Sequence, residues 1–207
     1  MRTRTAVVAL AAASAGLLAA PLAAARPPCD ALPGRAILAN ERAVVVERAD
    51  GSAVACHRGS RRVSRLWRGE TPLPFGVLAK RLAGRHVGFV SAASDRFGGQ
   101  AVFVSRIDTR TGARVVIPVG PGPGEPGPLT GVASFAMTAQ GAMAWAVAVA
   151  SPTRHVVFVA RADGSEAVDR GPEVDPASLA AAGRTVYWTR AGAAMSVTTP
   201  GPASRRA

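Results

Sequence analysis

Apolar residues recur along this chain in short runs of β-branched and aromatic side chains, each followed by a turn signal. Three runs are closely similar: 44–50 (VVVERAD), 102–108 (VFVSRID) and 157–163 (VFVARAD), and a weaker fourth is 186–192 (VYWTRAG). Asp-Gly at 50–51 and 163–164 suits a tight hairpin turn, and DTRTG at 108–112 suits a slightly longer one. We therefore expect hairpins whose returning strands lie at 53–57, 113–119, 166–169 and 194–199.

A second pattern precedes each of these runs. Leu-Ala-Asn-Glu-Arg-Ala-Val at 38–44 has counterparts at 82–87, 137–143 and 179–186, in which an apolar residue leads through a turn into an apolar strand. The residues that open these strands, at 44, 87, 143 and 186, are 43, 56 and 43 positions apart. The longer middle step contains the Gly/Pro-rich stretch 120–128, which indicates an inserted loop. The underlying period of about 43 residues is typical of propeller blades.

The stretch 143–149 (MAWAVAV) alternates large apolar residues with alanines. This period of two predicts a strand packed on both faces, as between blades. Helical segments are scarce: residues 176–182 (PASLAAA) are compatible with one or two helical turns, and residues 75–83 are ambiguous. The fourth unit shows two evident strands.

The L-A-x-G-R-x-V openings and the V-F-V-x-R-x-D-(x-x-x)-G hairpins resemble β-propeller repeats of the WD-like or TolB-like kind found in exported bacterial proteins. The resemblance covers roughly residues 36–199, with blade-like units near 36–68, 79–119, 135–171 and 178–199. It implies an all-β domain of four antiparallel repeats forming a small or incomplete propeller; a β-sandwich or an open stack of sheets is the alternative. It also implies a binding or scaffolding role, and it transfers no catalytic residue.

The N-terminus has the features of a secretory signal peptide. Arg2 and Arg4 precede the uncharged apolar stretch 6–20, and 22–25 (LAAA) supplies small residues for cleavage. We expect cleavage after Ala25, a domain over 26–199 and a disordered tail over 200–207; a retained N-terminal anchor is the alternative. The expected location is secreted or periplasmic, at the cell envelope.

Export would place the two cysteines in a compartment where disulfides form. In an oxidising compartment Cys29 and Cys56 are expected to form one disulfide that ties the mature N-terminus to the first unit. The three histidines show no ligand spacing, so neither a metal site nor a cofactor is expected.

The formal net charge is +12, and arginine carries almost all of the positive charge. Such a balance can attract anionic envelope polymers, although a compositional bias towards Arg, Ala, Gly and Pro is the favoured explanation. Arg48, Arg106, Arg161 and Arg190 recur two residues before the turn position. They form an anion-binding ring at one rim, or else they are structural, as cross-strand or inter-blade ion pairs or as solvated strand ends. Nucleic acid is not expected as a partner, because the basic cluster at 58–62 lacks interleaved aromatic residues.

No arrangement of residues indicates catalysis, so the chain is expected not to be an enzyme and to have no catalytic residue. The recurring Asp50, Asp108 and Asp163 are explained by turn chemistry. Trp67, Trp145 and Trp188 are expected as core anchors, or as a carbohydrate-stacking surface if exposed.

The expected function is an exported, non-catalytic binding or interaction module whose partner is a protein or an anionic envelope polymer. One alternative is a hydrolase or lyase, which would bring together two or more of Asp50, Asp95, Asp108, Asp163 and His86 in one pocket. The other is a subunit that completes a propeller with a partner chain, which would leave a strand edge unpaired.

Overall fold

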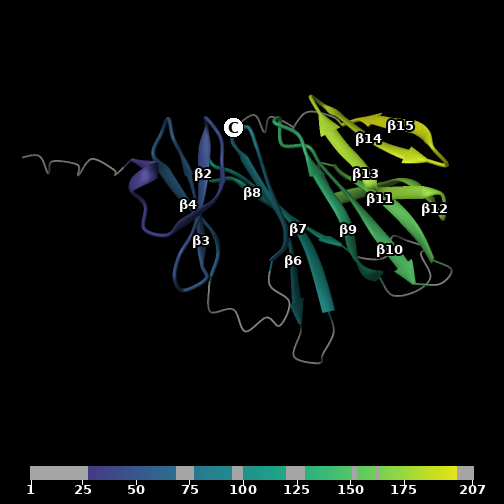
Figure 1. Ribbon diagram of the computed structural model, residues 1–207, viewed down its shortest axis with the longest axis horizontal. Coiled ribbons are helices and arrows are strands. Elements are labelled where there is room, and N and C mark those ends of the chain that lie inside the picture. The colour runs from purple at the N-terminus through teal and green to yellow at the C-terminus, as the bar shows by residue number, and fades with distance from the viewer. Residues whose placement is uncertain are drawn as a thin grey trace, which may run out of the picture.

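The computed structural model describes residues 28–68, 77–94, 100–119, 129–150, 153–161 and 164–199. The expected signal peptide, the loop at 120–128 and the tail at 200–207 lie outside these residues. The described residues form one short 3-10 helix and fifteen strands (Figure 1). They contain no helix that is long and apolar enough to cross a membrane.

The strands form four antiparallel sheets in which each strand pairs with the next along the chain. Sheet 1 consists of β1 (Arg35–Ala39), β2 (Ala43–Glu47), β3 (Ala53–His57) and β4 (Arg62–Trp67). Sheet 2 consists of β5 (Val77–Ala83), β6 (His86–Ser94), β7 (Gln100–Asp108) and β8 (Arg114–Val119). Sheet 3 consists of β9 (Leu129–Met137), β10 (Met143–Ala150), β11 (Thr153–Arg161) and β12 (Gly164–Gly171). Sheet 4 has three strands, β13 (Val174–Ala182), β14 (Thr185–Arg190) and β15 (Ala193–Thr198).

The first strands of successive sheets lie next to one another, because β5 contacts both β1 and β9, and β9 contacts β13. The remaining strands of each sheet extend outward from this inner row, as in the blades of a propeller. Figure 1 shows sheet 1 and sheet 4 at opposite ends of the long axis. The protein is therefore all-β, with four blade-like sheets in the arrangement of a small, incomplete propeller, and the two-sheet β-sandwich alternative does not apply.

The hairpin turns that the sequence predicts are formed where the structure describes them. Between β2 and β3, the Asp50 carboxylate accepts a hydrogen bond of 2.9 Å from the Ser52 backbone N–H, and Gly51 has a φ of +75°. Between β7 and β8, Asp108 accepts hydrogen bonds from the N–H groups of Arg110 and Thr111. Asp163 lies outside the described residues.

Strand β10 is buried on both faces, as its alternating pattern predicts. Its larger side chains, among them Trp145, pack with residues of β6, β7 and β8 in the core between sheets 2 and 3. Ala144 and Ala146 face the other way and pack with Val186 and Trp188 between sheets 3 and 4. Trp145 and Trp188 are 1% and 4% exposed, which confirms them as core anchors.

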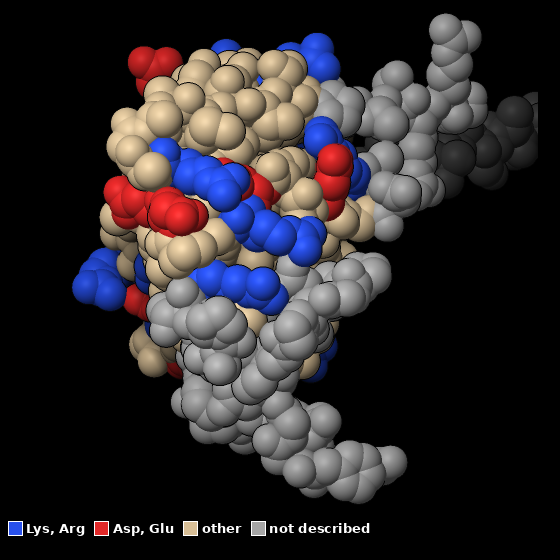
Figure 2. Space-filling view, turned by 90° about the vertical axis from the view of Figure 1, so that its right-hand side faces the viewer, with Lys and Arg blue, Asp and Glu red and all other residues tan. Residues whose placement is uncertain are grey.

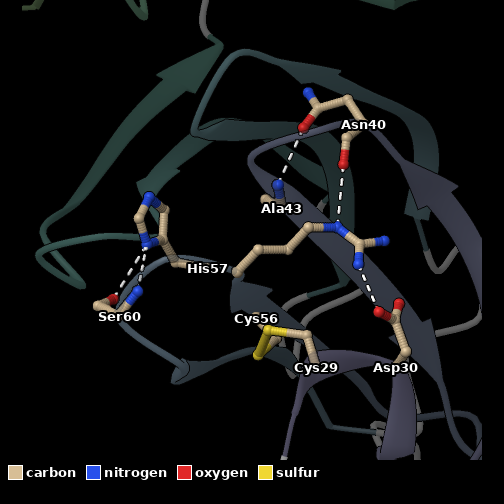
Figure 3. The surroundings of a disulfide bond; sticks show 8 residues. Cys29, Asp30, Asn40, Ala43, Cys56, His57 and Ser60 are labelled. Atoms are coloured by element: carbon tan, nitrogen blue, oxygen red, sulfur yellow. Dashed lines mark hydrogen bonds and ion pairs between the residues drawn. A yellow bond between two sulfur atoms is a disulfide. The ribbon is translucent and has the colours of Figure 1, made fainter.

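The free face of sheet 1 is covered by the N-terminal segment. The 3-10 helix η1 (Cys29–Ala31) packs with Val44, Val46 and Val54, and Cys29 is bonded to Cys56 on β3. The expected disulfide is therefore present, and Figure 3 shows it with its surroundings. The cysteines are 27 positions apart, and a loop of that size stabilises the fold by about 3–4 kcal/mol on the chain-entropy model.

The helix considered for residues 176–182 is wrong, because these residues belong to strand β13. Residues 180–182 pair in regular register with β14, and a register shift between Asp175 and Ala180 accommodates Pro176, which cannot donate a backbone hydrogen bond. The fourth unit consequently has three strands rather than two. The ambiguous segment 75–83 is a strand over Val77–Ala83.

Neighbouring sheets also meet at the turns between their first and second strands. The Asn40 side-chain amide donates a hydrogen bond of 2.8 Å to the Gly84 carbonyl, which links sheets 1 and 2. Gly84 has a φ of +56°, and a Cβ there would lie 2.9 Å from the Ala139 carbonyl oxygen of sheet 3. Gly183, at the equivalent turn of sheet 4, has the same φ of +56° but no atom within 4 Å of such a Cβ.

We expect Gly84→Ala to destabilise the protein more than Gly183→Ala. Both variants place alanine in the left-handed region, which costs about 1 kcal/mol. Only Gly84→Ala also forces a methyl group against the backbone of the next sheet, which adds about 1–3 kcal/mol. Urea unfolding followed by circular dichroism measures both free energies. Equal losses would show that the turns of sheets 2 and 3 do not pack as closely as the structure places them.

Candidate functional site

The core between sheets 1 and 2 is closed at one end and opens into a pocket at the other. At the closed end, Val87 and Ile107 are paired neighbours on β6 and β7 and pack with Val45 and Leu66 of sheet 1. Phe89 lies two residues after Val87 on β6, and from Phe89 onward the two sheets border a pocket of about 850 Å³. Residues of β4 line it on one side, and residues of β5, β6, β7 and β8 line the other.

Two cross-strand rows of sheet 2 line the pocket. Their members are opposite one another in the strand register and so project from the same face of the sheet. One row is Lys80, Phe89, Ser105 and Val116, and the other includes Val77, Ser91 and Phe103. The small Ser91 and Ser105 side chains leave room that larger residues would fill.

Aromatic side chains line part of the pocket. The Trp67 indole N–H donates a hydrogen bond of 3.1 Å to the Gly51 carbonyl, which fixes the ring. Trp67 also meets Phe89 edge-to-face, with ring centroids 5.6 Å apart. Trp67 and Phe103 are half-buried, so both present ring surface to the pocket. Trp67 is thus the one of the three tryptophans that is available for stacking a ligand.

Basic side chains also line the pocket. Arg65, Arg68 and Arg114 are exposed and Lys80 is half-buried, and all four belong to the lining. The Arg114 guanidinium lies 5.7 Å from the centre of the Phe89 ring and donates a hydrogen bond to the Leu66 carbonyl, so it connects the two sheets.

A single carboxylate, Glu47, is among the lining residues that the structure describes. Its Oε2 atom lies 2.9 Å from the Arg35 guanidinium, so an ion pair already engages it. The positive charge of the pocket lining therefore exceeds its negative charge. An anion with an apolar or ring-shaped part has the chemistry that fits this combination of cations and aromatic rings.

The four arginines predicted as an anion-contacting set are not among the lining residues of this pocket. Arg48 is exposed beside the β2–β3 turn. Arg106 donates a hydrogen bond to the Gly141 carbonyl of the next sheet, and Arg161 lies 2.6 Å from Glu166 on the adjacent strand. Arg190 bridges from sheet 4 to Asp169 on sheet 3, with 3.1 Å between charged atoms. Three of the four thus have partners within the protein, and anion binding by the set stays a prediction.

A buried polar cluster lies between sheets 2 and 3. His86 and Asp108 are opposite one another in the register of β6 and β7, and they are 5% and 9% exposed. Asp108 lies 3.1 Å from the Arg85 guanidinium, and the His86 ring adjoins Gly141 in the β9–β10 turn. Of the residues considered for an enzyme, this cluster brings together His86 and Asp108. Asp50 is in a separate hairpin, and Asp95 and Asp163 lie outside the described residues.

The surroundings of His86 favour its neutral form. Burial lowers the pKa of His86 to about 4; the Asp108 carboxylate opposes this shift, and the Arg106 and Arg85 guanidinium groups add to it. Burial acts to raise the pKa of Asp108, but the N–H groups of Arg110 and Thr111 and the neighbouring Arg85 hold it below its usual value.

The pocket residues Arg65, Arg68, Lys80, Phe89, Phe103 and Arg114 were not singled out from the sequence. Five of them lie on five different strands and Arg68 directly follows β4, so no local motif joins them. The available signal is the period of two within each strand, as in Phe103 and Ser105 on β7. That signal becomes a site only when the register between strands is known.

Comparison with solved structures finds a likeness to the β-propeller domain of the Trilobed protease from Pyrococcus furiosus, described as having an open velcro topology. The TM-score is 0.42 with 14% sequence identity, and the match covers 57% of this chain and 35% of that one. This chain therefore spans about a third of the length of that protein chain. No protein-family model matches the sequence, and no curated protein matches it.

We expect the protein to lose stability as the pH falls from 6.5 to about 4, the interval between the ordinary and the folded-state pKa of His86. In this interval the unfolded chain binds a proton that folded His86 does not, so protonation favours unfolding. Asp108 contributes to acid unfolding only below its ordinary pKa of 3.8.

Urea midpoints measured across this pH range test the expectation. His86→Leu should flatten the dependence, because it removes the buried imidazole. His57→Gln should retain it, because His57 is a partly exposed residue on a different sheet. A wild-type dependence that persists in His86→Leu would show that another group carries it.

Proposed function

We propose that this protein is an exported, non-catalytic binding module whose pocket between sheets 1 and 2 holds a segment of an anionic carbohydrate. One observation carries the proposal: exposed cations and half-buried aromatic rings line the same pocket. A sugar ring stacks on the aromatic side chains, and the acidic group of the sugar pairs with the basic ones.

The charge of the whole molecule supports an anionic ligand. A formal net charge of +12 raises the local concentration of anions by long-range attraction, whatever their structure. The pocket then supplies selectivity, because rings bound to Trp67 and Phe103 must carry their charge within reach of Lys80 or Arg65. Charge alone would attract any polyanion, whereas the combination favours one built from rings.

The sheet arrangement supports a binding role. Most of the pocket side chains lie on paired strands, and the Trp67 and Arg114 hydrogen bonds cross to other elements. Such a pocket is largely formed before the ligand arrives, which lowers the entropy cost of binding. The resemblance of the repeats to WD-like or TolB-like propellers also predicts a binding role.

Two features support export. Residues 1–25 have the charge, apolar stretch and small-residue end of a signal peptide. The disulfide between Cys29 and Cys56 favours an oxidising compartment, since cytosolic reductants keep thiols reduced. Location outside the cytoplasm would place the module where anionic envelope polymers are found.

We expect the protein to bind an oligogalacturonate, a chain of acidic sugars, more tightly than a neutral oligogalactose of equal length. Isothermal titration gives the affinities, and Trp67 gives a fluorescence change on binding. Lys80→Gln should weaken binding of the acidic chain about tenfold, through loss of one charge-assisted contact.

Arg81→Gln is the matched control. Arg81 neighbours Lys80 on β5, but the alternation of the strand directs it to the opposite face of sheet 2, away from the pocket lining. The variant removes the same charge and should retain wild-type affinity. If both variants weaken binding equally, or if linear polyphosphate binds as well as the acidic sugar, the attraction is nonspecific charge and the proposal fails.

We expect the full-length chain, produced in a bacterial host, to be recovered outside the cytoplasm and to begin at Arg26. N-terminal sequencing and intact-mass measurement identify the cleavage, and alkylation of free thiols reports the disulfide. Replacing Arg2 and Arg4 by glutamate should retain the chain in the cytoplasm, because the signal requires a positive start. An uncleaved chain in the membrane fraction would instead support the N-terminal anchor.

A further inference from the structure

Strand β15 occupies the position of a third strand, not of an outermost one. In sheets 1 and 2, the residue after the third strand donates its N–H to the turn between the first two strands: Arg58 to Arg42 and Thr109 to Arg85, each at 2.9 Å. In sheet 4, Thr199 donates in the same way to Arg184 at 2.8 Å. Strand β15 is therefore the counterpart of β3, β7 and β11.

In the other sheets, the far edge of the third strand pairs with a fourth strand. Those fourth strands are β4, β8 and β12, and they add side chains such as Leu66 and Ile117 to the cores between sheets. Within the described residues, sheet 4 has no fourth strand. The far edge of β15 is consequently unpaired in that part of the chain, and its residues are exposed except Val197, which is half-buried.

The β15 edge lacks the features that usually protect such edges. Its sequence, Ala-Ala-Met-Ser-Val-Thr, contains no charge and no proline. Figure 2 shows the end of the molecule to which sheet 4 and β12 contribute, where charged side chains form a band and a broad uncharged surface lies beside it. Met195, opposite Trp188 in the register and so on the same face, is 38% exposed.

We propose that β15 pairs antiparallel with β15 of a second copy of this chain, so that two three-stranded sheets join into one of six strands. A twofold axis perpendicular to the sheet keeps equivalent faces together, so residues of like parity lie opposite one another. With Met195 opposite Met195 of the partner subunit, Ala193 lies opposite Val197 of the partner subunit. The face that carries Trp188 then becomes continuous and apolar across the junction.

The strand is suited to a second copy for chemical reasons. On the other face, the same register places Ala194 opposite Ser196 of the partner subunit, so small side chains meet small ones. No residue of β15 is charged, so no like charges oppose each other across the axis. The second copy also supplies what the other sheets obtain from β4 and β8: backbone hydrogen bonds and alternate apolar side chains.

The oligomeric state of the purified, disulfide-bonded protein tests the proposal. Sedimentation equilibrium from micromolar to about millimolar protein should show a monomer–dimer equilibrium, because a single strand pair is a small interface. Met195→Lys should give a monomer, since it places two ammonium groups face to face at the axis. Met195→Glu should give a monomer for the same reason.

An equimolar mixture of Met195→Lys and Met195→Glu should recover the dimer, because opposite charges then meet at the axis. Tyr187→Lys is the control: it adds the same charge to an exposed residue of β14, which is not an edge strand, and should leave the dimer unchanged. Far-UV circular dichroism and urea midpoints establish that every variant is folded.

Three outcomes would overturn the proposal: a wild-type protein that stays monomeric throughout this concentration range, a mixture that stays monomeric, or a Tyr187→Lys variant that dissociates as Met195→Lys does. The first would show that the β15 edge does not pair with a second copy of this chain. The second would exclude the Met195 register, and the third would attribute dimerisation to surface charge rather than to the edge.

Discussion

Sheet-to-sheet packing is the constraint on which the rest of this structure depends. A single repeat unit cannot bury its apolar side chains alone, and sheets 2 and 3 are each buried on both faces by their neighbours. Strand β10 meets this requirement by placing methionine, tryptophan and valine against sheet 2 and alanines against sheet 4. The size difference sets the spacing, because the thin alanine face admits the bulky Val186 and Trp188 of sheet 4. Hydrophobic burial between sheets thereby organises strands whose backbone ladder hydrogen bonds run only within each sheet.

Each of the two end sheets has one face that no other sheet covers, and the two faces differ in how they meet the solvent. Sheet 1 covers its valines with helix η1, which the disulfide holds in place and an ion pair of 2.5 Å between Arg58 and Asp30 reinforces (Figure 3). Sheet 4 instead exposes polar and small residues outward, with Tyr187 the largest. Terminal units of repeat proteins commonly have a polar outer face of this kind. The two ends therefore differ from each other, and the described sheets form an open row.

Local features of the fold could be predicted from the sequence because local chemistry determines them. The Asp50 and Asp108 turns depend on side chains that bond two or three residues ahead, so a few letters suffice. The alternation in 143–149 predicted burial of both faces of β10 for the same reason. Strand β13 was missed because its alanine-rich sequence has no strand preference of its own; pairing with β14 and contact with β9 determine its conformation.

The pocket shows why the site was harder to predict than the fold. Most of its side chains come from β4 through β8, and the strand register brings them together. Without that register, the sequence points instead to the arginines two residues before each turn as an anion-binding set, because they recur. Recurrence in a repeat protein more often marks a shared structural role, and Arg161 and Arg190 are paired with carboxylates of the protein itself. Residues that differ between repeats, such as Lys80 and Trp67, are better candidates for binding.

An open pocket between sheets 1 and 2 also costs free energy, because apolar surface there is left unburied. Leaving aromatic surface open to water forgoes about 25 cal/mol for each Å² that a closed interface would bury. The four cations of the lining oppose closure, because bringing the sheets together would desolvate like charges. At the closed end, Val87 and Ile107 pack against Val45 and hold the two sheets together, while the sheets stay apart at the pocket end. The proposed anionic sugar ring would offset both costs at once, because it would cover the aromatic surface and neutralise the cations that keep the pocket open.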